Sequence, residues 1–163
     1  MYVFVYGTLK PGGRYHQSFC QDKCLAAEAA KVKGTLYDLA LDYPAMQEAI
    51  HPESEGWVYG NLLHFESSQV LVALDRLEGY DVTQSMEDNE YQRIRCDCFT
   101  QSGVFIARVW TYVMEAEQLA RYPYRVIPNG NWPVGLSSPP KWAITCAKQF
   151  RLNVVSLIIH AAN

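Results

Sequence analysis

Glu78 is the residue whose position most clearly suggests chemistry. It ends the stretch "QVLVALDRLE", whose leucines recur at helical spacing and form one apolar arc. At about 100° per residue, Glu78 falls between Leu71 and Leu74 within that arc, whereas Asp75 and Arg76 fall outside it and are predicted to face water. Burial and the negative end of the helix dipole would both raise the pKa of Glu78, which is how a glutamate becomes a general base near neutral pH.

Two ordinary explanations for a glutamate at this position stay open. The side chain of Glu78 would reach solvent at the helix end, or it would pair with Arg93 or Arg95. These two arginines alternate with Ile94 in a predicted strand and so share one strand face. On that face a structural ion pair is as reasonable as a contact with substrate.

The stretch "VFVYGTLKPGG" near the start drives a fully apolar strand into a glycine-bearing turn. Successive backbone N–H groups in such a turn form a nest that binds an anion. Gly7 would allow a ligand to approach the backbone closely, or would permit a strained backbone angle. A plain chain reversal is the alternative, and the Walker and G-x-G-x-x-G spacings of phosphate-binding loops are absent.

The elements that must position these residues are mostly strands. Both faces of "YVFVY" are apolar, which is typical of a strand covered on both sides. Helices are predicted over 15–25, 69–78 and 141–150, and "ALDYPAMQ" is predicted as an irregular connection. Further strands are predicted at "KVKGTLYDL", "GWVYGNLLHF", "EYQRIRCDCF" and "VFIARVWTYV", the last two joined as a hairpin at "TQSG", and "LNVVSLII" is strand or helix. This order predicts an α+β fold whose mixed, mostly antiparallel sheet closes into a small β-barrel with a few flanking helices.

Composition indicates one ordinary globular domain. The 163 residues are 49% hydrophobic and 19% charged, with a net charge of −3. This balance gives no general attraction to nucleic acid or to an anionic membrane, so neither is expected as a partner. No signal peptide is expected at the N-terminus, and composition leaves monomer and homodimer equally open.

The cysteines favour a cytoplasmic location. Their number is odd, at five, which argues for reduced thiols. A four-thiolate zinc site would need Cys20, Cys24, Cys96 and Cys98, but the spacings are unusual for such sites, and ordinary buried thiols are favoured. The four histidines are dispersed without ligand spacing, so no metal ligand and no cofactor is expected.

Taken together, "VFVYGTLKPG", "GTLYDLALDYPAM", "VYGNLLHF", "LDRLEGYD" and "YQRIRCDCF" resemble the gamma-glutamylcyclotransferase-like superfamily. The similarity is to its short branch, which includes gamma-glutamylamine cyclotransferases and avirulence-induced-gene-like proteins. It implies a compact mixed α/β fold with a small barrel, which we expect over 1–136. The extension over 137–163 has no match in the family core, and we expect it to pack on the same domain.

The resemblance also implies the site. Its glutamate in the E-G-Y segment matches Glu78 and would be the general base. Its Y-G-[ST]-L loop would hold the carboxylate and amino end of a gamma-glutamyl group through backbone N–H donors. The residues that would bind substrate are Tyr6, Gly7, Thr8 and Leu9 of that loop, Tyr43 of "YPA", and Tyr91 and Arg93 of the Y-x-R segment.

The implied reaction is a cyclisation within the substrate, whose α-amino group attacks its own γ-carbonyl and releases 5-oxoproline and an amine. Since the nucleophile belongs to the substrate, no serine or cysteine nucleophile is needed, and no triad signature is present. The substrate stays open among a gamma-glutamylamine, a gamma-glutamyl amino acid and a protective gamma-glutamyl group of a biosynthetic intermediate. The alternative from another class is a non-catalytic module that binds a small carboxylate in the same loop.

Overall fold

The computed structural model describes residues 1–49 and 56–133. None of the helices in these ranges is both long and apolar enough to cross a bilayer. The described elements, in chain order, are β1 (Tyr2–Val5), the π-helical turn η1 (Gln17–Gln21), β2 (Cys24–Leu39), β3 (Pro44–Glu48), β4 (Trp57–Phe65), α1 (Val70–Leu77), the 3₁₀ turn η2 (Met86–Asp88), β5 (Gln92–Thr100), β6 (Phe105–Val113), α2 (Ala116–Leu119) and β7 (Tyr124–Val126).

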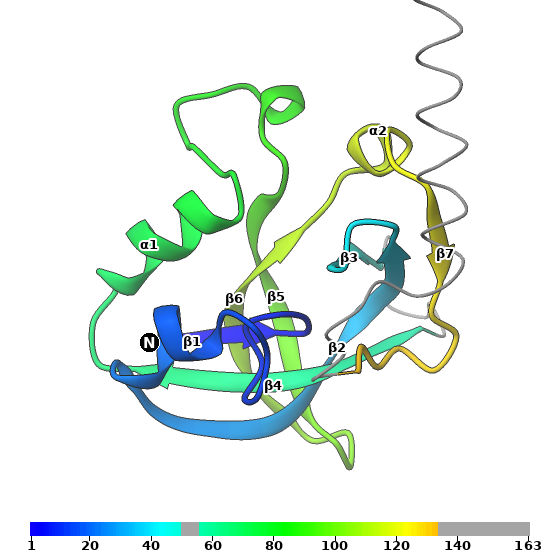
Figure 1. Cartoon of the computed structure of the whole chain (residues 1–163). Coiled ribbons are helices and arrows are strands. Elements are labelled where there is room, and N and C mark those ends of the chain that lie inside the picture. Colours follow the sequence, from blue (N-terminus) through cyan, green and yellow to red (C-terminus); the bar gives the residue numbers. More distant parts are fainter. Residues whose placement is uncertain (50–55, 134–163) are drawn as a thin grey trace, which may run out of the picture.

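Five strands form a closed barrel in the order β2-β4-β1-β6-β5 (Figure 1). β1 lies between β4, to which it is antiparallel, and β6, to which it is parallel. The pairing of β2 with β5 closes the circle, and every other pairing in it is antiparallel. The predicted α+β fold with a mixed, mostly antiparallel barrel is therefore confirmed.

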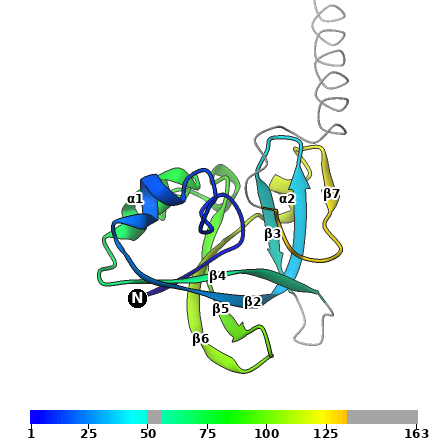
Figure 2. The same cartoon turned by 60° about the horizontal axis from the view of Figure 1, so that its bottom comes forward.

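The long strand β2 belongs to two sheets. Its first half pairs with β4 and β5 inside the barrel, whereas its last residues pair with β3 on one side and β7 on the other. Figure 2 shows β2 leaving the barrel and rising between these two short strands. The turn from β2 to β3 brings residues 40–44 beside the end of β1.

β3 corrects the expectation of an irregular connection around "ALDYPAMQ". Pro44 is the first residue of the strand, a position where its missing N–H costs no ladder hydrogen bond. Ala45 and Met46 are fully buried, and the Met46 carbonyl accepts a hydrogen bond from the Met114 N–H at 2.8 Å. Proline therefore marks the beginning of a strand here instead of breaking regular structure.

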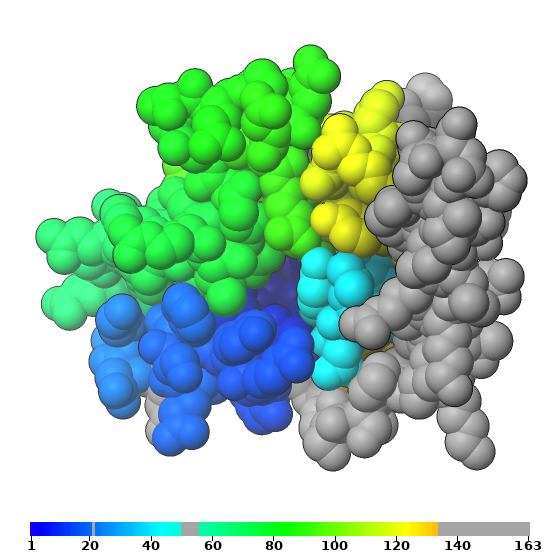
Figure 3. Space-filling model, turned by 45° about the horizontal axis from the view of Figure 1, so that its top comes forward, coloured from blue at the N-terminus to red at the C-terminus, as the bar shows by residue number. Residues whose placement is uncertain are grey.

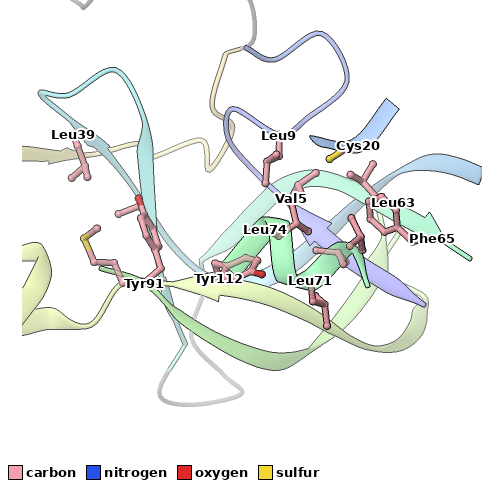
Figure 4. Close-up of a cluster of buried hydrophobic side chains, with 14 of the residues drawn as sticks. Val5, Leu9, Cys20, Leu39, Leu63, Phe65, Leu71, Leu74, Tyr91 and Tyr112 are labelled. Carbon is pink, nitrogen blue, oxygen red and sulfur yellow. The ribbon is translucent and has the colours of Figure 1, made fainter. Parts of the chain in front are cut away.

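Both faces of β1 are buried, as its sequence predicts. Phe4 and Tyr6 belong to a hydrophobic cluster with members from all five barrel strands, so this cluster fills the barrel interior. Val3 and Val5 point the other way, into a second cluster that α1 covers with Leu71 and Leu74 (Figure 4). The barrel wall thus separates two cores, and α1 is held against the outer one.

Three other expectations have three different outcomes. The helix predicted over 15–25 is only the turn η1, because β2 already begins at Cys24. Cys20 and Cys24 belong to the outer cluster, whereas Cys96 and Cys98 belong to the barrel interior. The helix at 141–150, the stretch "LNVVSLII" and the extension over 137–163 lie outside the described residues.

Candidate functional site

A pocket of about 170 Å³ opens where the end of β1 meets α1 and the β2–β3 turn. In Figure 3, a hollow separates the blue N-terminal segment, the green segment that contains α1 and the cyan β3 segment, with β1 at its floor. The chain contributes to the pocket from six separate places. The lining residues are Phe4, Val5, Tyr6, Gly7, Thr8, Leu9, Tyr15, Tyr43, Pro44, Leu77, Glu78, Glu90, Tyr91 and Tyr112.

Glu78 follows the last residue of α1 and lines this pocket. Its N–H still donates to the Leu74 carbonyl at 2.9 Å, and Gly79, with φ of 63°, then ends the helix as predicted. Burial and, as a smaller cause, the nearby charge of Glu90 together raise the pKa of the Glu78 carboxyl to about 8. A carboxyl of this pKa accepts and returns a proton near neutral pH.

Glu90 is a second carboxylate in the same pocket, which the sequence analysis did not identify. Its N–H donates to the Gly79 carbonyl at 3.1 Å, so its backbone lies directly beside the end of α1. Its Oε1 accepts a hydrogen bond from the Tyr43 hydroxyl at 2.7 Å. The only sequence signal for it is its place next to Tyr91, because ten residues of loop separate it from Gly79.

The tyrosines of the pocket fasten its walls to one another. The Tyr6 hydroxyl donates to the Tyr112 carbonyl, and the Tyr91 hydroxyl donates to the Pro44 carbonyl, both at 2.9 Å. Burial raises the pKa of both phenols well above the ordinary value, so they stay protonated at neutral pH. Tyr112 and Tyr15 also line the pocket and were not predicted from the sequence.

The loop after β1 is a fixed turn whose donors face no backbone partner. The Gly7 carbonyl accepts from the Lys10 N–H at 3.1 Å, and the Thr8 carbonyl accepts from the Tyr15 N–H at 3.0 Å. Within residues 1–49 and 56–133, the N–H groups of Gly7, Thr8 and Leu9 make no hydrogen bond to backbone outside the regular elements. Successive N–H groups without a backbone partner are the donors that an anion-binding nest would use.

Lys10 anchors the far end of this loop. It is 6% exposed, and its ammonium group donates to the Trp132 carbonyl at 2.5 Å and to Asn131 Oδ1 at 3.2 Å. Burial lowers the pKa of Lys10. A buried ammonium group with these two acceptors ties the loop to the segment that follows β7.

Gly7 is required by packing against the β2–β3 turn. A Cβ at this position would lie 2.6 Å from Pro44 Cγ and 2.9 Å from Pro44 Cδ. Gly7 has no positive φ, so the strained backbone angle that was one expectation for it is absent. The close approach that the structure shows is that of the Pro44 ring, whereas the sequence suggested a ligand. The turn that carries Tyr43 and Pro44 is thereby held against the loop.

We expect Gly7→Ala to lower the free energy of unfolding by about 1–3 kcal/mol, because the added methyl group overpacks this contact. Activity should fall more than the loss of folded protein explains, since the loop donors and Pro44 both line the pocket. Urea denaturation and a turnover assay would measure the two effects. Gly103→Ala is the matched control: Gly103 has φ of 96° and open space around it, so that variant should lose stability while keeping activity.

Arg93 does not line the pocket, although the resemblance placed it in the site. Its Nη1 donates to Asp75 Oδ2 at 2.6 Å, and its guanidinium group lies 5.2 Å from the Tyr80 ring and 5.0 Å from the Trp110 ring. Asp75 Oδ1 also accepts from the Tyr112 hydroxyl at 2.7 Å. Asp75 was predicted to face water, and that prediction is wrong: it joins α1 to β5 and β6.

The arrangement is suited to a small ligand that carries both charges. Among the described residues that line the pocket, the charged side chains are Glu78 and Glu90, and none is a lysine or arginine. A carboxylate would be received by backbone N–H groups of the loop, and an ammonium group by the two glutamates. The structure brings together Tyr6, Gly7, Thr8, Leu9, Tyr43, Glu78 and Tyr91 of the predicted residues.

Residues 3–134 match the family model described as "Gamma-glutamyl cyclotransferase, AIG2-like". A relative from Niallia circulans, gamma-L-glutamyl-butirosin B gamma-glutamyl cyclotransferase, is 28% identical over 111 residues, which cover 68% of this chain and 65% of the relative. The chain therefore spans slightly less than two thirds of that relative.

Solved structures show the same fold. An aig2-like protein from Mus musculus aligns over 81% of this chain and 87% of its own, with 21% identity and a TM-score of 0.53. YkqA from Bacillus subtilis aligns over 80% of this chain but 39% of its own, with 25% identity and a TM-score of 0.55. Since the family model covers most of the sequence, the chain belongs to the AIG2-like gamma-glutamyl cyclotransferase family.

Proposed function

We propose that the protein is a gamma-glutamyl cyclotransferase that acts on a gamma-glutamyl amine or a gamma-glutamyl amino acid. The observation that carries the proposal is that Glu78 and the Gly7–Leu9 loop line one pocket. Family membership and the named activity of the Niallia circulans relative support the same reaction. The products would be 5-oxoproline and a free amine.

In this proposal the loop N–H groups bind the substrate's α-carboxylate, and the α-ammonium group lies against Glu78. Glu78 takes a proton, and the freed amine attacks the γ-carbonyl carbon. The new C–N bond closes a five-membered ring, and the C–N bond to the departing amine then breaks. The ring nitrogen loses two of its three protons in all, and both end on the departing amine, which leaves as an ammonium ion.

The protein contributes alignment and proton transfer. Holding the amine close to the carbonyl carbon is worth up to roughly 7–11 kcal/mol of the barrier in well-aligned intramolecular reactions. A base matched to the working pH contributes about 10²–10⁴-fold. Both contributions come from the chain's own groups in this proposal, with no protein nucleophile.

The test is to incubate the purified protein with a panel of gamma-glutamyl alkylamides, gamma-glutamyl-lysine and gamma-glutamyl dipeptides, and to measure 5-oxoproline by chromatography. Release from at least one of these substrates, together with an equal amount of amine, is the expected result. If no 5-oxoproline appears from any of them, while 5-oxoproline itself still binds, the protein is a carboxylate-binding module and the proposal is wrong.

The pH dependence of kcat/KM should follow Glu78. The pKa of Glu78 is raised to about 8, and the base must be unprotonated to accept the substrate's proton. We therefore expect kcat/KM to fall about tenfold for each pH unit below that value. Initial rates between about pH 6 and 9 would show this limb, and a plateau that extends down to about pH 5 would contradict the assignment.

A further inference from the structure

Glu90 occupies a position that the reaction described above does not use. It lines the pocket beside Glu78, and its backbone bonds to Gly79, the residue that follows Glu78. A Cβ on Gly79 would lie 3.0 Å from Glu90 Cβ and 3.5 Å from Glu90 Oε2. The two glutamate side chains thus start from adjacent backbone segments and enter one small space.

The groups around Glu78 differ sharply in charge. Phenol and thiol groups come from the residue after β1, from η1, the β2–β3 turn, the residue before β5, and β6. Burial raises the pKa of each, so that all are neutral at pH 7. Among the groups around Glu78, Glu90 is the one whose charge raises the pKa of Glu78. The neutral groups are Tyr6, Cys20, Tyr43, Tyr91 and Tyr112.

Glu90 and Glu78 have different surroundings. The Tyr43 hydroxyl donates a 2.7 Å hydrogen bond to Glu90 Oε1, which fixes the position of that carboxyl in the pocket. Two carboxyl groups in one site divide their roles when their surroundings differ in this way. One exchanges protons, and the other binds the substrate.

We propose that Glu90, held by Tyr43, is a second substrate-binding carboxylate that receives the positively charged α-ammonium group while Glu78 exchanges the proton. This inference rests on the proposed function and adds a binding group to it. It explains why a pocket for an acidic glutamyl group contains two carboxylates and, among its described lining residues, no basic side chain. The positive end of the substrate balances charges that would otherwise repel each other.

The distinguishing measurement compares two ligands that differ at the ammonium group. Gamma-glutamyl ethylamide carries it, whereas 5-oxoproline has a neutral ring nitrogen in its place and keeps the carboxylate. Affinities would be measured by calorimetry in the Glu78→Gln background, so that the amide is not consumed, with and without Glu90→Gln.

We expect Glu90→Gln to weaken binding of the ethylamide about tenfold or more, as the loss of a charge-assisted hydrogen bond does. Binding of 5-oxoproline should change by less than about twofold or become tighter. Tyr43→Phe should also weaken ethylamide binding, but by less than Glu90→Gln does. Glu90→Asp, which keeps the carboxylate, should retain part of the affinity that Glu90→Gln loses. With Glu78 intact, Glu90→Gln should also move the acidic limb of kcat/KM to lower pH.

Two results would overturn the inference: unchanged affinity for the ethylamide, or an equal loss for both ligands, which would mean that Glu90 only supports the fold. These results leave the proposed function standing, because the wild-type protein would still release 5-oxoproline. The reverse result, selective loss of ethylamide binding without product from wild-type protein, would keep Glu90 as an ammonium-binding group and reject catalysis.

Discussion

Replacing Glu78 by glutamine should reduce 5-oxoproline release by about a thousandfold, because glutamine keeps the shape of the side chain and cannot take the proton. The change is measured as kcat with a saturating gamma-glutamyl amide. The affinity for 5-oxoproline should be retained, since the loop donors are untouched. A variant that keeps more than about a tenth of the wild-type kcat would exclude Glu78 as the general base.

The same substitution should stabilise the fold at alkaline pH. The pKa of Glu78 is about 8 in the folded protein, against the ordinary 4.5. The unfolded chain therefore binds fewer protons between these values, and this carboxyl makes the wild-type protein less stable as pH rises from 4.5 to 8. In thermal melts, the melting temperature of Glu78→Gln relative to that of the wild type should rise as the pH increases from 4.5 to 8. Glu66→Gln, at an exposed site, is the matched control and should change neither activity nor this difference.

Removing the Asp75 carboxylate should cost about 3 kcal/mol of unfolding free energy. Asp75→Ala leaves the Arg93 guanidinium group and the Tyr112 hydroxyl without their shared acceptor, and the side chains of the ion pair are only 18% and 21% exposed. Activity should fall as well, because Asp75 fixes α1 to β5 and β6 one helical turn before Glu78. Urea unfolding with turnover of the remaining folded protein would separate the two losses.

A surface ion pair of the same type supplies the control for that variant. Arg108 and Asp97 lie 3.6 Å apart, with side chains 67% and 57% exposed. Exposed pairs contribute about 0–1 kcal/mol, so Asp97→Ala should leave stability and turnover nearly unchanged. Equal effects of Asp75→Ala and Asp97→Ala would mean that Asp75 does not anchor the helix.

Patterns of neighbouring residues predicted the elements whose structure depends on neighbouring residues. The continuous apolar run in β1 forecast burial on both faces, and the spacing of leucines around Glu78 forecast a helix that ends at Gly79. The hairpin of β5 and β6 follows from two strand-like runs joined by "TQSG". In each case the determining residues are neighbours in the chain.

The features that the sequence did not predict depend on partners far away along the chain. A helical projection assigns Asp75 to solvent because it contains no information about Arg93 and Tyr112, which arrive from the β5–β6 hairpin. Glu90 enters the pocket only when the loop from Gly79 returns to the end of α1. Pro44 begins a strand because β2 extends beyond the barrel and offers an edge to pair with.

The parallel pairing of β1 with β6 has a consequence for folding speed. Val3 lies opposite Trp110, so β1 is paired on both sides only after more than a hundred residues of intervening chain have been brought together. Closing so large a loop is entropically costly before any contact repays it, and such topologies fold slowly. The Gly7–Leu9 loop that follows β1 should therefore become ordered late, and hydrogen-exchange labelling during refolding should find its amides among the last to be protected.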